Sequence, residues 1–430
     1  MLDVSSLIRL KASFSAATAR GGFELLGESV ELVIPGQDTV AIVYGENITK
    51  WSPIVVKRID LNPTKLPNPS ALPIVEESES CVFDPTGTYL VVTYYGGFSG
   101  PHFTIYKRSG GTFTKLPDPS TMPNSRCYDC AFDPTGTYLA VVHFLDPRIT
   151  IYKRSGDTFT KLPNPSTLPI GSGQGCAFDP TGTYLAVSHF GSPYITIYKR
   201  SGDTFTKLPN PSTLPTGAGF GCAFDPTGTY LAVAHNNSPY ITIYKRNGDT
   251  FTKLPDPSAL PTDSGNKCAF DPTGTYLAVA HNSSPYITIY KRSGDTFTKL
   301  ANPSTLPTGN GYDCAFDPTG TYLAVAHDSS PYITIYRRSG DTFTKLANPS
   351  ALPTGNGRGC AFDPTGRNLA VVHYNSPYIT IYNAFSRAVF KTGNSLLDIQ
   401  AADVIAAGYA KEDGSAGEIK EIVRIWRLEG

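Results

Sequence analysis

Histidine is the residue of this sequence best suited to holding a metal, and six of its seven histidines recur at one position of an internal repeat. They are His143, His189, His235, His281, His327 and His373, and Tyr94 holds the same position in the first copy. The ligands of one metal ion lie within a few ångströms of each other, whereas packed β-sheets stand about 10 Å apart. Histidines of different copies therefore cannot share an ion, and we predict structural histidines with no bound metal and no cofactor.

Cysteine recurs in the same way. Seven of the eight cysteines occupy a second repeated position, at Cys81, Cys130, Cys176, Cys222, Cys268, Cys314 and Cys360. A disulfide needs Cα atoms about 4.4 to 6.8 Å apart, so we predict small buried side chains near the axis of the fold rather than bridges. Cys127 and Cys130 form one C-x-x-C motif, which has no partner pair and does not by itself indicate a metal or redox site.

Both positions belong to a repeat that occurs seven times. Cys81 and Cys130 are 49 residues apart, and each later interval is 46 residues. The third copy contains four segments with the length and alternation of short strands, at Cys176–Phe178, Tyr184–His189, Tyr194–Lys199 and Thr204–Leu208. Asp179–Gly182 and Ser201–Asp203 supply the turns between strands one and two and between strands three and four. Four antiparallel strands at this spacing are typical of a propeller blade.

The ends of the repeat indicate how the ring closes. The seventh copy stops after its third strand, Tyr378–Tyr382, whereas Pro63–Pro73 is a fourth strand and its following loop without the first three. We expect this N-terminal strand to complete the seventh blade, which removes open sheet edges. The predicted fold is all-β, a seven-bladed β-propeller over residues 59–383. The 40 glycines and 36 prolines then serve mainly as repeated turn residues.

The flanking residues, 1–58 and 384–430, do not repeat. We expect them to form one small β-domain that anchors the propeller on the side of its constant turns. Its predicted strands are Val30–Ile34, Thr39–Tyr44, Asp403–Tyr409 and Glu418–Trp426, the last two forming a hairpin.

Charge and hydropathy exclude two classes of partner. The 36 lysines and arginines balance the 36 aspartates and glutamates, so the cationic excess that a nucleic-acid binder uses to displace counterions is missing. No run of 18 apolar residues exists, and we expect no membrane insertion. The Lys-Arg pairs that begin at Lys107 and Arg108 face repeated aspartates such as Asp157 and Asp203. We interpret them as solvated cross-strand pairs rather than a site for an anionic partner.

The stretch Phe178–Val187, Phe-Asp-Pro-Thr-Gly-Thr-Tyr-Leu-Ala-Val, resembles the strand-turn-strand of WD-repeat and lactonase-like bacterial propellers. Ile197 and Tyr198 stand where a WD repeat has Trp-Asp, and the Gly-His that precedes the first strand is also missing. The near-identical tandem blades are similar to those of bacteriophage virion and tail-associated proteins. That resemblance implies a virion protein assembled in the host cytoplasm.

The copies differ mainly at one end of the blades. Asp-Pro-Thr-Gly occurs in all seven copies, whereas the links between strands two and three and between blades vary. Near the repeated cysteine the varying residues are Glu79, Tyr128, Asp129, Gln174, Phe220, Asn266, Lys267, Tyr312, Asp313 and Arg358. After the second strand they are Tyr95, Phe144, Phe190, Asn236, Asn282, Asp328 and Tyr374. Aromatic, amide and charged groups on one face suit recognition, so we predict a binding face here. Drift of loops after duplication is the alternative.

Three functions remain open. The first is a non-enzymatic phage virion protein whose variable face binds a host surface glycan or protein, and which contacts other virion proteins through residues 1–58 and 384–430. The second is a structural decoration or joint protein of capsid or tail. The third is a lactonase-like hydrolase, in which non-repeated groups such as Glu76, Glu77, Glu79, Arg126 and Lys267 converge over the central channel.

Overall fold

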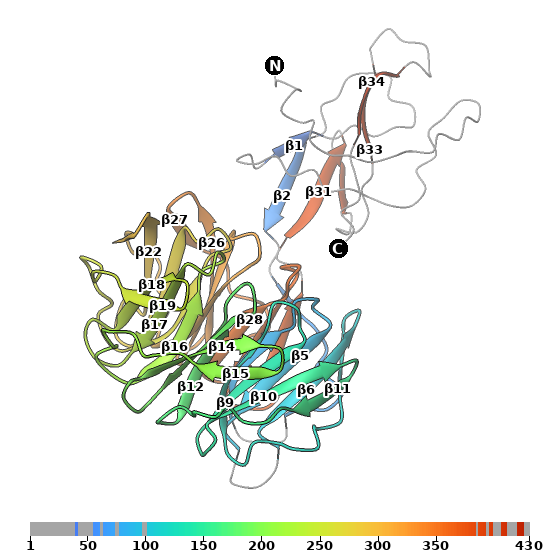
Figure 1. Cartoon of the computed structure of the whole chain (residues 1–430). Coiled ribbons are helices and arrows are strands. Elements are labelled where there is room, and N and C mark those ends of the chain that lie inside the picture. The colour runs from blue at the N-terminus through green and yellow to red at the C-terminus, as the bar shows by residue number, and fades with distance from the viewer. Residues whose placement is uncertain are drawn as a thin grey trace. The chain divides into compact units, whose positions relative to one another are not determined.

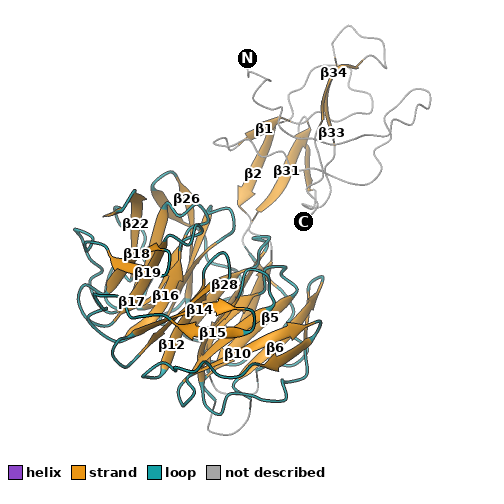
Figure 2. Ribbon diagram, in the orientation of Figure 1, coloured by secondary structure: helices purple, strands orange, loops and turns teal. Residues whose placement is uncertain are grey.

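The computed structural model describes residues 39–41, 55–60, 63–73, 77–96, 101–383, 386–392, 395–398, 406–410 and 419–424. The chain divides into two compact units, Asn62–Asn383 and the combination of Met1–Leu61 with Ala384–Gly430. Figure 1 shows the strands of the larger unit as successive blades, and Figure 2 shows only strands and loops in the described residues. The described part of the chain therefore contains no helix that could span a membrane.

The larger unit is a seven-bladed β-propeller. Each blade is a four-stranded antiparallel sheet. The innermost strands are β4 (Ser78–Phe83), β8 (Cys127–Phe132), β12 (Gly173–Phe178), β16 (Gly219–Phe224), β20 (Gly265–Phe270), β24 (Gly311–Phe316) and β28 (Gly357–Phe362). The second strands are β5 (Tyr89–Tyr94), β9 (Tyr138–His143), β13 (Tyr184–His189), β17 (Tyr230–His235), β21 (Tyr276–His281), β25 (Tyr322–His327) and β29 (Asn368–His373). The fold predicted from the repeat is confirmed.

The outer strands complete the blades. The third strands are β6 (Phe103–Ser109), β10 (Ile149–Ser155), β14 (Ile195–Ser201), β18 (Ile241–Asn247), β22 (Ile287–Ser293), β26 (Ile333–Ser339) and β30 (Ile379–Asn383). The fourth strands are β7 (Thr112–Lys115), β11 (Thr158–Lys161), β15 (Thr204–Lys207), β19 (Thr250–Lys253), β23 (Thr296–Lys299), β27 (Thr342–Lys345) and, for the seventh blade, β3 (Thr64–Lys65). Thr64 pairs with Asn383 and Lys65 with Tyr382, so an N-terminal strand closes the ring as predicted.

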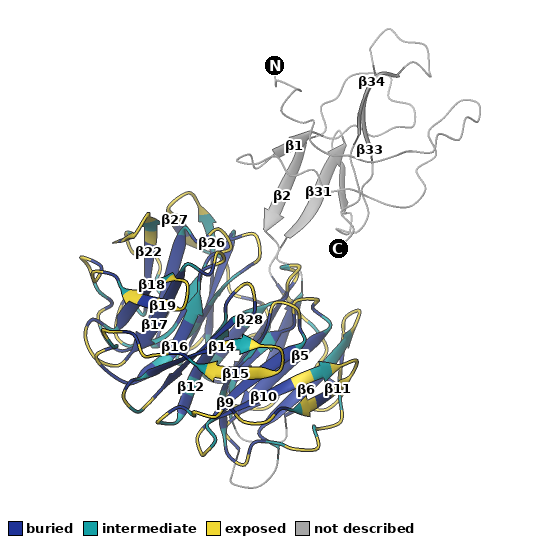
Figure 3. Ribbon diagram, viewed as in Figure 1, coloured by how far each residue is buried: buried dark blue, intermediate teal, exposed yellow. Residues whose placement is uncertain are grey.

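The core lies between the blades. Every residue of the second strands is buried, in the dark blue of Figure 3, because both faces of these strands pack against neighbouring sheets. Leu185 and Val187 of β13 are fully buried with Cys176 and Phe205, and they pack against Ala140 of the preceding blade. Apolar side chains on both faces of a strand match the near-continuous apolar runs of the sequence. Each blade therefore needs its neighbours to bury its surface.

The repeated Asp-Pro-Thr-Gly turn is held by its own aspartate. In the third blade the carboxylate of Asp179 accepts hydrogen bonds from the Tyr184 amide at 2.7 Å and the Thr181 hydroxyl at 2.6 Å. Gly182 has a φ of +67°, and a Cβ there would lie 3.2 Å from Cδ of Pro134 in the preceding blade. The turn therefore requires glycine for its backbone conformation and for close contact between blades. This explains why the constant turns did not vary.

Polar contacts at the constant-turn end join neighbouring blades. The Tyr184 hydroxyl donates to Asp249 of the next blade at 2.5 Å, Lys199 forms a 2.8 Å ion pair with the same carboxylate, and the Arg246 guanidinium lies 4.6 Å from the Tyr184 ring centre. Equivalent contacts occur from the first blade through the sixth. The lysines do pair with the repeated aspartates, as the sequence indicated, but the pairs join adjacent blades and are not cross-strand pairs within one sheet.

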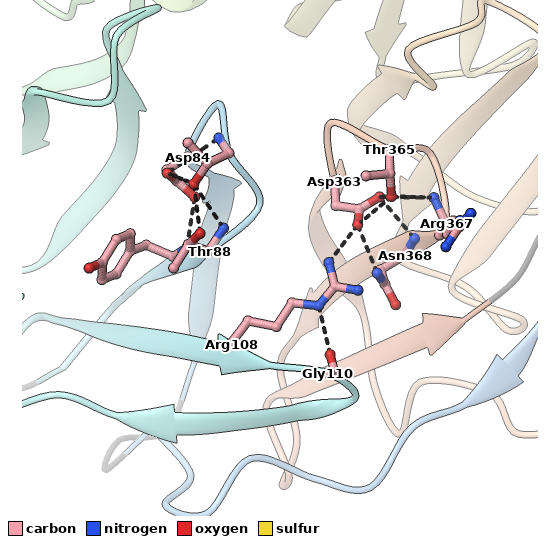
Figure 4. A network of polar contacts seen from close by, with 10 residues as sticks. Asp84, Thr88, Arg108, Gly110, Asp363, Thr365, Arg367 and Asn368 are labelled. Carbon is pink, nitrogen blue, oxygen red and sulfur yellow. Dashed lines mark hydrogen bonds and ion pairs between the residues drawn. The ribbon is translucent and has the colours of Figure 1, made fainter. Parts of the chain in front are cut away.

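The contact between the seventh and first blades is different. Gly111 replaces the aspartate of this arrangement and Asn368 replaces the tyrosine. Instead, Arg108 of the first blade forms a 2.8 Å ion pair with the fully buried carboxylate of Asp363, which also accepts a hydrogen bond from the Asn368 side chain at 2.8 Å (Figure 4). The junction that closes the ring therefore uses a buried ion pair in place of the tyrosine–aspartate hydrogen bond found between the other blades.

The smaller unit contains strands from both ends of the chain. β1 (Thr39–Ala41), β2 (Val55–Asp60), β31 (Ser386–Thr392) and β32 (Ser395–Asp398) form one sheet in that order. β33 (Ala406–Ala410) pairs with β34 (Ile419–Arg424), which agrees with the predicted hairpin. Ile59 and Asp60 pair with β31, and the larger unit begins at Asn62, three residues after the predicted start. The predicted strand at Val30–Ile34 and part of Thr39–Tyr44 lie outside the described residues.

Candidate binding face

The four-stranded antiparallel blades put their connections on two opposite faces of the ring. The Asp-Pro-Thr-Gly turns and the turns between the third and fourth strands lie on the constant face. The links between the second and third strands and those between blades lie on the other, which we call the variable face. The chain enters β3 and leaves β30 at the constant-face end of these strands.

The first set of varying residues lies in the innermost strands, not in the links where the sequence pattern suggested. In each blade the strand pairing shifts by one residue, for example between Gly173 and Gly175 of β12. The residues at these bulges are Glu79, Tyr128, Gln174, Phe220, Asn266, Tyr312 and Arg358. A bulge redirects the side chain of its extra residue. These seven half-buried residues form what we call the inner ring of the variable face.

The next residue of each innermost strand faces the central channel. Lys267 of the fifth blade forms an ion pair with Asp129 of the second. Because these blades are not neighbours in the ring, the pair must span the channel. Asp129 also accepts hydrogen bonds from the Ser80 hydroxyl at 2.7 Å and the Cys176 amide at 3.1 Å.

Asp313 of the sixth blade is the third charged group at this level. It accepts the Cys314 amide at 2.8 Å and the Cys360 amide at 3.0 Å. Burial raises the pKa of Asp313 to about 6, although the positive charge of Lys267 opposes that shift. Burial alone would lower the pKa of Lys267, but Asp129 and Asp313 together raise it above its ordinary value. The predicted site residues Asp129, Lys267 and Asp313 therefore form an internal charge cluster across the channel.

The residues that follow the second strands form an outer ring with two unlike halves. In blades seven, one, two and three they are aromatic and exposed: Tyr374 (40%), Tyr95 (39%), Phe144 (36%) and Phe190 (50%). We call these four residues the aromatic arc. Blades four, five and six carry Asn236, Asn282 and Asp328 instead. The Asn282 amide oxygen accepts a 2.9 Å hydrogen bond from Asn266 of the inner ring. The variable face is thus aromatic on one side and polar on the other.

Two arginines lie among these aromatic side chains. The guanidinium carbon of Arg126 is 4.4 Å from the ring centre of Tyr95 and 4.1 Å from that of Phe144. That of Arg358 is 4.5 Å from the ring centre of Tyr312. Stacking of this kind fixes a guanidinium in place and leaves its edge to donate hydrogen bonds. Phe190 also packs edge-on against Phe220, with ring centres 5.5 Å apart, so the arc and the inner ring are one packed surface.

Glu79 is the acidic member of the inner ring. Burial raises the pKa of its carboxyl group, and the positive charge of Arg358 and, more weakly, of Arg126 lowers it. These three residues come from the first, seventh and second blades, which are consecutive in the ring. Two of the predicted non-repeated polar groups, Glu79 and Arg126, thus lie on consecutive blades together with Arg358, which that prediction did not include, while Glu76 lies outside the described residues.

The histidines are fully buried next to the variable face. Nε2 of His189 is 2.9 Å from the Thr196 hydroxyl of the third strand, and the other five repeat the contact. In the first blade the Tyr94 hydroxyl forms the equivalent hydrogen bond with the Thr104 hydroxyl, at 3.1 Å. Burial lowers the pKa of His143, His189, His235, His327 and His373 to about 4. They are neutral structural groups, and the described residues hold no cluster of three His, Cys, Asp or Glu suited to a metal ion.

The cysteines have no disulfide partners. All eight are buried thiols, and burial raises the pKa of each. The Sγ of Cys176 lies 3.9 Å from the carbonyl oxygen of Ala140 in the preceding blade. The interpretation of this position as a small buried residue is confirmed.

A cavity of about 310 Å³ opens at the constant end of the channel, away from the aromatic arc. Its lining includes Phe83, Phe132, Phe270, Phe316 and Phe362, together with the prolines of the repeated turns. The lining comes from repeated residues of the first, second, fifth, sixth and seventh blades, so the cavity carries little of the variation that distinguishes the other face.

Comparison with known proteins supports the fold. Residues 80–255 match the family model described as lactonase, 7-bladed beta-propeller, which is less than half of the chain. Among solved structures, the chain is similar to hydrazine synthase of Kuenenia stuttgartiensis, with 14% identity, a TM-score of 0.57, and coverage of 73% of this chain and 97% of that one. It is also similar to the Cps50 (Swd1) propeller domain of Myceliophteria thermophila, with 12% identity, a TM-score of 0.56, and coverage of 73% and 99%. No curated protein matches the sequence. At these identities the solved structures establish the fold alone.

Arg126 is the residue that the sequence-based site prediction left out of the binding face. It stands four residues before the repeated Cys130, where other copies have Glu77, Ser172 or Ala218. The variation among the copies at this position could have indicated that Arg126 belongs to the binding face. The stacking between Tyr95 and Phe144 depends on the side-by-side packing of the first two blades, which the repeat pattern alone does not reveal.

Proposed function

We propose that the protein is a non-enzymatic binding protein whose variable face recognises a glycan on a host cell surface, and that it belongs to a bacteriophage virion. The observation that carries the binding proposal is the aromatic arc. Its four exposed aromatic residues sit on four consecutive blades, at a position where the remaining three blades carry two amides and a carboxylate. Exposed rings bordered by polar groups suit the apolar faces and hydroxyl edges of sugars.

The packing of the arc supports a prearranged site. Arg126 is held between two rings of the arc, and Phe190 is packed against Phe220. A ligand that binds to already ordered side chains loses less conformational entropy than one that must order them. Random drift of loops gives no reason for aromatic residues to gather on adjacent blades and to stack with a cation.

The proposed attachment to a particle rests on the resemblance of the tandem blades to those of phage virion proteins. In this proposal residues 1–58 and 384–430 contact other virion proteins, and the variable face is the part that binds the host. Immunogold labelling or mass spectrometry of purified particles tests it, because absence of the chain from particles would exclude a virion role.

A glycan array tests the binding proposal. The wild-type chain should bind a defined subset of glycans, and Phe144→Ala with Phe190→Ala should weaken that binding at least tenfold, since each change removes one exposed ring. Thr204→Ala, an exposed residue of the outer strand β15, is the control and should bind as the wild type does. Binding that survives loss of both rings would refute the location of the site.

The lactonase family match favours a hydrolase as the second candidate. In that case Glu79 and the arginines near it would act on a lactone ring over the channel. Incubation of the purified chain with a panel of sugar lactones separates the two functions. A binding protein leaves the rate of hydrolysis at the uncatalysed level, whereas turnover that falls with Glu79→Gln would support the hydrolase.

A further inference from the structure

Two arginines of the variable face, Arg126 and Arg358, have stacking partners but no ion-pair partner among the described residues, whereas Arg148 pairs with Asp146. Among the ion pairs between described residues, neither Arg126 nor Arg358 is a member. In contrast, Lys267 in the channel and Arg108 between the first and seventh blades each form an ion pair with a carboxylate. A guanidinium covered on its faces can still donate hydrogen bonds from its edge.

Each of the two arginines also has N–H donors that no described carboxylate accepts. Arg126 directs one N–H group to the Tyr95 hydroxyl, which leaves other donors of its five without an acid acceptor in the described structure. Nε of Arg358 is buried without a hydrogen-bond partner, while its guanidinium stacks on Tyr312. Because Nε of Arg358 is buried, a ligand can reach only the terminal N–H groups of that guanidinium. An acidic acceptor placed there, or at the open donors of Arg126, would form a charge-assisted hydrogen bond.

We propose that the glycan bound by the variable face carries a carboxylate, and that Arg126 and Arg358 are the residues that recognise it. The ligand class is therefore acidic saccharides, with the sugar ring on the aromatic arc and the carboxylate at the arginines. A carboxylate is planar and accepts two parallel hydrogen bonds from the edge of a guanidinium, which is the geometry that stacked arginines offer. This inference rests on the proposed glycan-binding function.

Substitution of Glu79 tests the inference, because acidic and neutral ligands predict opposite effects on binding. Its carboxyl group feels the charges of both arginines but is within ion-pair distance of neither in the described structure. A bound carboxylate would be attracted by the same two arginines and repelled by the negative charge of Glu79. Replacing Glu79 with glutamine should therefore strengthen binding of an acidic sugar. If the ligand were neutral, Glu79 would instead accept hydrogen bonds from sugar hydroxyls, and the same change would weaken binding.

The experiment uses oligosaccharides of polygalacturonic acid, sialic-acid glycans, and each of these after reduction of the carboxyl group to an alcohol. Binding is measured for the wild-type chain and for Arg126→Gln, Arg358→Gln and Glu79→Gln. Arg367→Gln is the matched control, because Arg367 is exposed in the constant turn of the seventh blade. Circular dichroism confirms that each variant is folded.

Carboxyl reduction and each of the two arginine changes should weaken binding about tenfold or more, as expected for a charge-assisted hydrogen bond. Glu79→Gln should strengthen binding by roughly fivefold through loss of a like charge, and Arg367→Gln should have no effect. Equal binding of the acidic and reduced sugars, or of neutral glycans on the array, would overturn the acidic class while leaving glycan binding intact. No binding of any acidic or neutral glycan would overturn both proposals.

Discussion

Acid should unfold the propeller through its buried histidines. Five of them have a pKa of about 4 in the folded chain, against about 6.5 for an unfolded histidine. The unfolded chain therefore binds more protons between these two values. Stability is fully present above pH 6.5 and is lost as the pH falls towards 4, by about 3 kcal/mol per histidine. Five such losses total roughly 15 kcal/mol, as much as an ordinary domain has.

Two buried acids act in the opposite direction, because burial raises the pKa of both Glu79 and Asp313. Asp313, with a pKa of about 6 in the folded chain, binds its proton more tightly when folded than the ordinary value of about 3.9 allows, so it offsets roughly one histidine. For the five histidines and Asp313 together, unfolding near pH 5 takes up about four protons, and their contribution to the free energy of unfolding should fall by about 5 kcal/mol per pH unit as the pH is lowered.

The first blade supplies the matched variant. Because Tyr94 makes the same hydrogen bond to threonine that the histidines make, His189→Tyr should preserve that contact and remove one titrating group. Urea unfolding between pH 7.5 and 4.5 should show a slope lower by about 1.4 kcal/mol per pH unit. A slope unchanged by this substitution, or histidine resonances that titrate near 6.5 in the folded chain, would refute the reasoning.

Three further predictions concern stability and reactivity. Arg108→Ala should cost about 3 kcal/mol because it leaves the buried carboxylate of Asp363 without its cation. Lys199→Ala, at an exposed pair between two other blades, should cost much less than Arg108→Ala; equal costs in urea unfolding would contradict the distinction. Lys267→Met should destabilise the chain by about 3 kcal/mol and raise the pKa of Asp313 further, since the cation that opposes its shift is lost; an unchanged Asp313 titration by NMR would argue against the cluster. The eight cysteines should react with a thiol reagent only after unfolding, since all are buried, and rapid labelling of the native chain would show that the interior is open.

The repeat made the ring, its closure and its two faces predictable, because each depends on local patterns and chain order. The alternation in Tyr184–His189 and the Asp-Pro-Thr-Gly turn define a blade, and the isolated fourth strand before the first copy completes the seventh. The same reasoning identified every member of the aromatic arc, since the position after the second strand can be read from any copy.

The contacts that cross between blades were not predictable. Asp129 and Lys267 are 138 residues apart in the chain, and only the geometry of the closed ring brings them together. The inner-ring residues were expected in the links, but they lie at bulges of the innermost strands, which the sequence pattern does not reveal. Likewise, Arg108 and Asp363 belong to the first and seventh copies, and they form an ion pair because ring closure places their blades side by side.

The central claim is that the aromatic arc contacts a glycan, and hydroxyl-radical footprinting tests it most directly. The chain is oxidised with and without a glycan that binds it on the array, and modification of each aromatic side chain is measured. We predict strong protection of Phe144, Phe190 and Tyr374, with no change at the phenylalanines that line the constant-end cavity, such as Phe316. Protection at that cavity with an unprotected arc would contradict the account.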